Sequence, residues 1–154
     1  MMGALEQTIH NIEAMSRDIW DMKPEPPAVT ALKKKRFTPS GTVPAVFYAC
    51  FDVANGSSYL VIARDMLLEP QNRLKECTAL LEKFFTGMAG RYATWGLQDI
   101  AGQLQAALKN LGDTADRDVL LRLVESLLVY NNKLWNRLDM CIPWFELDQN
   151  IALR

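Results

Sequence analysis

Apolar residues recur along the last third of the chain at the spacing of an α-helix that packs against other helices. Over residues 116–142 they alternate at intervals of four and three, which predicts one long helix with a face buried along its length. One position in this seam is an asparagine, Asn131. A buried amide needs hydrogen-bond partners, so Asn131 is expected to fix helix register or partner choice. The seam consists of Leu120, Val124, Leu127, Asn131, Leu134, Leu138 and Cys141.

Three further stretches carry apolar stripes with the same period. The first covers residues 4–22, the second follows Pro70, and the third covers 97–111. Each stripe recurs every three or four residues, which predicts an amphipathic helix. Gly87 and Gly90 are expected to loosen the chain after the second of these helices. These stretches, with the C-terminal seam, favour a helical bundle.

Residues 43–69 are ambiguous. The Asn55-Gly56 pair lies between apolar, β-branched and aromatic residues, which is typical of a β-hairpin with a tight turn. The same pair also suits the end of one helix and the start of another. No third strand is visible, and a lone hairpin is marginally stable in water. We therefore predict two helices here, with a hairpin at 45–66 as the alternative.

The composition changes between residues 23 and 42, where prolines and basic residues gather. Closely spaced prolines forbid a continuing helix. We predict an N-terminal amphipathic helix at 1–22, a Pro-rich basic linker at 23–42 and a helical domain at 43–154. The fold class is then an all-α bundle of five or six helices, with α+β as the alternative. Whether the first helix packs on its own chain or on another stays open.

The bulk composition is that of one folded domain. The chain has 154 residues, of which 49% are hydrophobic and 23% charged, with a net charge of −1. This balance provides no basic field of the kind that attracts nucleic acid. No stretch has the roughly twenty apolar residues of a membrane span, and polar residues interrupt any N-terminal signal sequence. A cytoplasmic location is expected.

The sequence offers few groups for catalysis or metal binding. It contains one histidine, His10, and three cysteines at wide spacings, which argues against a zinc or CxxC redox site. Phosphate-binding loops, dinucleotide fingerprints and nucleophile elbows are absent from it. We therefore expect no enzyme activity, no metal and no cofactor. If Asp52, Asp65 and Glu76 converged in a pocket, they would argue for an enzyme.

The remaining function class is binding to another protein. Aromatic side chains anchor protein interfaces, although at helical spacing they are also typical core residues. A linker-separated amphipathic helix is a second candidate contact surface. Whether several copies of this chain assemble with one another is left open. The candidate partner-binding residues are Tyr92, Asn131 and Trp135 in the later helices and Ile12, Ile19 and Trp20 in the first.

A basic run in the linker supports an alternative function. Lys33, Lys34, Lys35 and Arg36 are consecutive and would suit phosphate, an anionic lipid surface or an acidic protein. Four charges without interleaved aromatic residues are more typical of a solvated loop. A nucleic-acid or anionic-surface binder is therefore the second hypothesis.

Two stretches of the chain resemble a known family. RYATWGLQDIAGQLQAAL at 91–108 and LVESLLVYNNKLWNRL at 123–138 resemble the flagellar biosynthesis regulator FlaF. The resemblance implies a small, helical, cytoplasmic, non-enzymatic protein that links flagellin secretion or translation to filament assembly. It also implies a flagellar component as partner and adds Lys133 to the candidate residues. The residues that carry it are Tyr92, Gly96, Leu97, Asn131, Lys133, Leu134 and Trp135.

Overall fold

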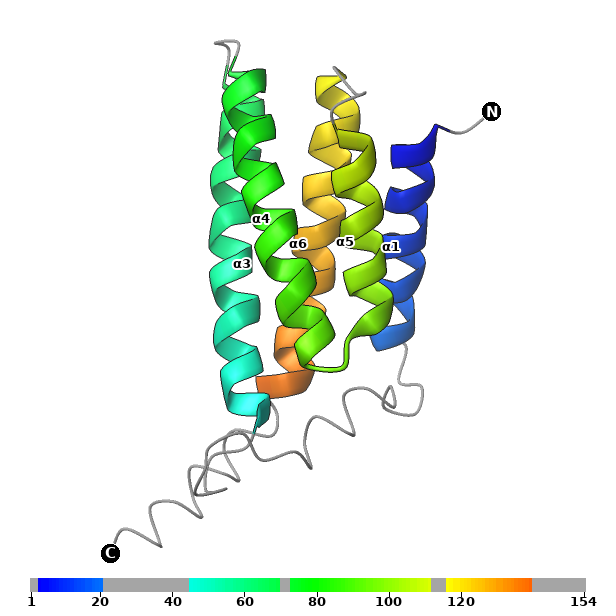
Figure 1. The fold of residues 1–154 in the computed structure, drawn as a ribbon, viewed down its shortest axis with the longest axis vertical. Coiled ribbons are helices and arrows are strands. Elements are labelled where there is room, and N and C mark those ends of the chain that lie inside the picture. The colour runs from blue at the N-terminus through cyan, green and yellow to red at the C-terminus, as the bar shows by residue number, and fades with distance from the viewer. Residues whose placement is uncertain (1–2, 21–44, 70–72, 112–115, 140–154) are drawn as a thin grey trace, which may run out of the picture.

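The computed structural model describes residues 3–20, 45–69, 73–111 and 116–139. This part of the chain is helical and contains no strand. Successive helices alternate in direction along one common axis (Figure 1). The predicted all-α bundle is confirmed, and the hairpin alternative at 45–66 is wrong. The helices are α1 (Ala4–Trp20), α3 (Ala45–Leu68), α4 (Leu74–Thr94), α5 (Gln98–Leu111) and α6 (Arg117–Asp139).

The N-terminal helix packs on its own chain. Helix α1 contacts α5 and α6, α6 also contacts α3, and α4 lies between α3 and α5. The apolar stripe of α1 supplies Ile9, Ile12 and Ile19 to the core, each no more than 5% exposed. The helices before and after residues 21–44 therefore share one hydrophobic core.

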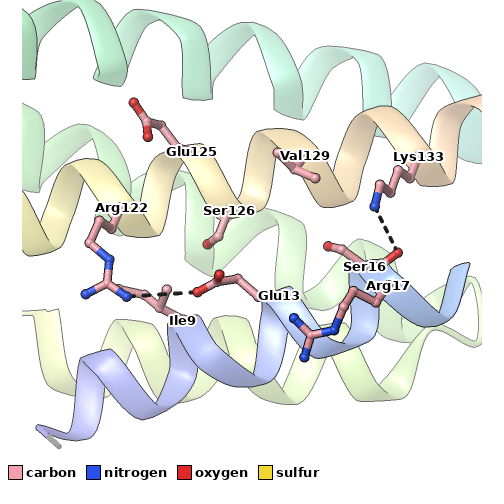
Figure 2. A pocket seen from close by; sticks show the side chains of 9 residues that line it. All are labelled: Ile9, Glu13, Ser16, Arg17, Arg122, Glu125, Ser126, Val129 and Lys133. Carbon is pink, nitrogen blue, oxygen red and sulfur yellow. Dashed lines mark hydrogen bonds and ion pairs between the residues drawn. The ribbon is translucent and has the colours of Figure 1, made fainter. Parts of the chain in front are cut away.

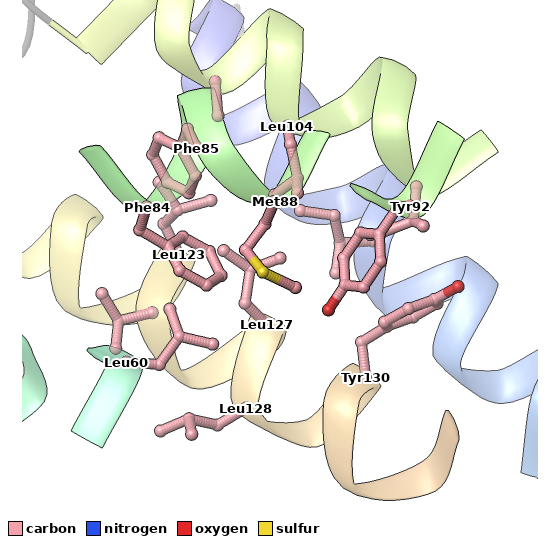
Figure 3. Close-up of a cluster of buried hydrophobic side chains, with 14 of the residues drawn as sticks. Leu60, Phe84, Phe85, Met88, Tyr92, Leu104, Leu123, Leu127, Leu128 and Tyr130 are labelled. Carbon is pink, nitrogen blue, oxygen red and sulfur yellow. The ribbon is translucent and has the colours of Figure 1, made fainter. Parts of the chain in front are cut away.

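The core is built from the predicted stripes together with the inner side of α3, which contributes Leu60 (Figure 3). The stripe of α4 places Phe84, Phe85 and Met88 between the flanking helices, and the two phenyl rings meet edge to face at 5.5 Å. The seam of α6 is buried at every described position, whereas the side chains of Leu138 and Cys141 lie outside the described part. The buried members are Leu120, Val124, Leu127, Asn131 and Leu134.

The two helices expected over 43–69 are one. Helix α3 continues without interruption through Asn55 and Gly56, so the predicted break is wrong. A Cβ atom added to Gly56 would lie 3.1 Å from Met88 Cε and from Phe84 Cε2. The glycine is there because α3 and α4 approach closely, and not because a helix ends.

Helix α4 runs through Gly87 and Gly90, so the expected loosening at these residues is also wrong. It ends at Thr94 and is followed by Gly96, whose φ of 86° is readily accessible only to glycine. The amide of Gly96 donates to Ala93 O at 3.0 Å, and the amide of Leu97 donates to Tyr92 O at 2.8 Å. This Schellman arrangement ends α4 and turns the chain into α5.

The ends of α3 and α6 are joined. The guanidinium of Arg117, the first residue of α6, donates to the carbonyl oxygens of Leu67 and Glu69 at the end of α3. These carbonyls have no partner within their own helix. The carboxylate of Asp116 accepts from the amide of Asp118 at 2.9 Å and caps the start of α6.

Candidate functional site

Tyr92 and Asn131 meet inside the bundle. The Tyr92 hydroxyl donates to Asn131 Oδ1 at 2.5 Å, and both residues are at most 1% exposed. Burial, followed by the neighbouring Tyr130, raises the pKa of Tyr92. Asn131 Nδ2 is buried and has no hydrogen-bond partner within the described residues. In this chain the pair is an internal contact between α4 and α6, and neither side chain reaches the outer surface.

A second polar contact joins the end of α4 to α3. The Trp95 indole Nε1–H donates to Asp52 Oδ2 at 2.5 Å, and Arg91 Nη1 lies 3.9 Å from Asp52 Oδ1. Glu76, in the first turn of α4, pairs with Arg73. It is about 28 Å along the helix from Trp95, so Asp52 and Glu76 do not converge. The described residues contain no group of three potential metal ligands.

The other candidate residues are spread over the molecule. Lys133 Nζ donates to the backbone oxygen of Ser16 at 3.4 Å and so connects α6 to α1. Trp135 is 38% exposed near the end of α6. Ile12 and Ile19 are core residues of α1. The Trp20 side chain and the basic run Lys33, Lys34, Lys35 and Arg36 lie outside the described part of the chain.

A groove of about 400 Å³ lies between α1 and α6 (Figure 2). Three cations and two carboxylates line it, and Arg122 approaches Glu13 at 4.0 Å. The buried Ser16 and Ser126 hydroxyls donate to carbonyls of their own helices. The mixed charges oppose selection of a ligand by its charge sign. The groove is lined by Ile9, Glu13, Ser16, Arg17, Arg122, Glu125, Ser126, Val129 and Lys133.

The outward side of α3 is apolar. Five of the seven large hydrophobic side chains that are exposed in the described residues belong to this helix, with Phe51 56%, Ile62 48% and Leu68 59% exposed. The exposed positions of α1, α4 and α5 are instead mostly charged or polar. Contiguous exposed apolar surface is typical of interaction sites. We call Phe51, Tyr59, Val61, Ile62 and Leu68 the α3 apolar face.

Sequence reasoning missed this face because α3 is apolar on all sides. Such a helix is normally buried in a core, and the Asn55-Gly56 pair obscured its continuity. The available signal was the lack of charge: Asp52 is the only charged residue between Ala45 and Ala63. Although α3 is the most apolar helix, none of the described helices combines the length and hydropathy needed to cross a bilayer.

No protein-family model matches the chain, and neither a curated protein nor a solved structure shows detectable similarity to it. The similarity of residues 91–108 and 123–138 to flagellar regulators stays a prediction.

Proposed function

We propose that the protein is a non-enzymatic helical adaptor or regulator that binds another protein through the α3 apolar face. The observation that carries this proposal is the concentration of exposed large apolar side chains on one helix. Water in contact with this surface is released when a partner covers it, which favours association.

The chemistry of the face suits a protein partner. Phe51 and Tyr59 are aromatic and Ile62 is branched, and such side chains form the buried centres of interfaces. Asn55 and Ser58 are exposed between them and supply polar groups that can fix a register. The resemblance to flagellar regulators supports a flagellar component in the cytoplasm as a candidate partner.

The proposal is tested with the double variant Phe51→Ser/Ile62→Ser in the full chain. Val129→Ser on α6 is the matched control, because Val129 is also apolar and 47% exposed. Circular dichroism first establishes that each variant retains its helix content. Quantitative affinity capture should then show proteins that the wild type and Val129→Ser retain and the double variant loses. Identical capture by all three chains would contradict the proposal.

A further inference from the structure

We propose that the α3 apolar face pairs with the same face of a second copy of this chain, the two α3 helices lying antiparallel about a twofold axis. This inference rests on the proposed function and names the partner of that surface. A twofold interface requires a surface that is complementary to itself. The residue pattern of α3 meets this requirement.

The exposed residues along the middle of α3 have a symmetric spacing. Phe51, Asn55, Ser58 and Ile62 are exposed and follow one another at intervals of four, three and four residues. These intervals keep them on one side of a helix. In an antiparallel pair centred between residues 56 and 57, Phe51 faces Ile62 of the second copy and Asn55 faces Ser58 of the second copy.

The polar pair in the middle is matched in hydrogen bonding. The Ser58 hydroxyl donates to Ala54 O at 3.3 Å, so its oxygen has lone pairs to accept a further bond. The Asn55 amide offers two N–H donors. Twofold symmetry forms this Asn55-to-Ser58 bond twice. Each bond gives one Asn55 N–H and one Ser58 oxygen a partner, which lowers the penalty that opposes burying these groups against an apolar partner.

Charge does not oppose the pairing. No residue between Val53 and Ala63 is charged. The exposed Asp65 lies beyond Ile62, and in this pairing it is opposite position 48 of the second copy, which carries no charge. Asp52 is half-buried and engaged with Trp95. The net charge of −1 per chain adds little long-range repulsion between copies. Two copies can therefore bring these helices together without placing like charges opposite each other.

The size of the face fits a reversible dimer. Large side chains bury on the order of 200 Å² each when fully covered, so five side chains that are about half exposed offer roughly 500 Å² per chain. Two copies would bury roughly 1,000 Å² plus the surrounding rim, which is at the lower end of specific interfaces. We expect a weak dimer that dissociates on dilution.

Sedimentation equilibrium of the full chain tests the proposal. The concentrations run from roughly 1 to 200 µM, which covers the micromolar dissociation constants of weak dimers. The wild type and Val129→Asp should both show a monomer–dimer equilibrium. Phe51→Asp alone and Ile62→Lys alone should be monomeric, because each places a charge against an apolar side chain. A mixture of the two should form a heterodimer, since the aspartate of one chain then faces the lysine of the other.

Each result decides the matter. A dimer that persists in Phe51→Asp, or a mixture that stays monomeric, would overturn the proposed pairing. If either charged variant fails to fold, Phe51→Ser and Ile62→Ser replace it and should weaken dimerisation at least tenfold. A wild type that is monomeric throughout, with protein capture still lost in Phe51→Ser/Ile62→Ser, would refute self-association and leave the proposed function standing. Failure of both experiments would refute both.

Discussion

At the scale of single residues, we expect the bond between Tyr92 and Asn131 to fix how α4 and α6 align. It is a polar contact inside an otherwise apolar core, and it forms only when the two helices have one relative register. Burying these groups costs stability unless they pair. Asn131 Nδ2 has no partner within the described residues. The site therefore favours a specific packing of the helices over the greatest stability.

Tyr92→Phe tests this pair. Removing the hydroxyl leaves the buried Asn131 Oδ1 without its donor, so the free energy of unfolding should fall by about 1–3 kcal/mol. Asn131→Leu should likewise leave the Tyr92 hydroxyl unpaired. The double variant removes both polar groups and should be more stable than the sum of the single effects allows. Urea denaturation of the four chains measures this, and simple additivity would show that the bond carries no coupling.

Buried weak acids determine the response to alkaline pH. Burial raises the pKa of Tyr92, of Tyr130 and of Cys77, the last to about 11. The unfolded chain ionises these groups at their ordinary values, about 8.5 for cysteine and 10 for tyrosine, and so binds fewer protons than the folded chain above those values. The free energy of unfolding should therefore be level from about pH 7 to 8 and fall as pH rises beyond about 9. Denaturation midpoints across this range measure how steeply the free energy of unfolding falls with pH. The fall should be less steep in Tyr92→Phe. An equal slope would contradict the contribution assigned to Tyr92.

At the scale of helices, the packing of α3 depends on Gly56, which the sequence pattern placed at a turn or at a helix end. Gly56→Ala would place a methyl group 3.1 Å from Met88 Cε and Phe84 Cε2. Crowding of this kind costs about 1–3 kcal/mol, against about 1 kcal/mol gained in helix propensity, so we expect net destabilisation of about 1 kcal/mol. Gly87→Ala is the matched control, because nothing lies within 4 Å of that position. It should stabilise the protein by about 0.5–1 kcal/mol, and thermal melts of both variants give the comparison. Equal gains in both would show that α3 and α4 are not tightly packed at Gly56.

The helices that the sequence predicted well are the amphipathic ones. The stripes of α1, α4, α5 and α6 each separate apolar from polar residues, so periodicity alone indicates both the helix and its buried side. Helix α3 offers no such contrast. Its inner side is selected by the space beside Phe84 and Met88 and by the Asn131 amide, none of which is local in sequence. Burial of Ile12 and Ile19 in the same core was equally hidden, because it depends on α5 and α6.

At the scale of the whole molecule, the candidate surface emerges only after the helices are assembled. Of the helices that the structure describes, four turn polar sides outward and α3 turns a mostly apolar side outward. Asn131 was expected in the seam of the last helix and lies there, whereas Tyr92 was predicted as a partner-binding residue and lies buried against Asn131. The surface for a partner is instead provided by Phe51 and Ile62, which no motif distinguishes.

The placement of α1 between α5 and α6 affects how the protein folds during synthesis. Ile9, Ile12 and Ile19 are synthesised before the helices that cover them, which come about a hundred residues later in the chain. Contacts so distant along the chain form slowly, and the apolar stripe of the nascent α1 stays uncovered until α6 is complete. Helix α1 is therefore buried only after α5 and α6 have been made, and this interval is when a chaperone would have most to bind.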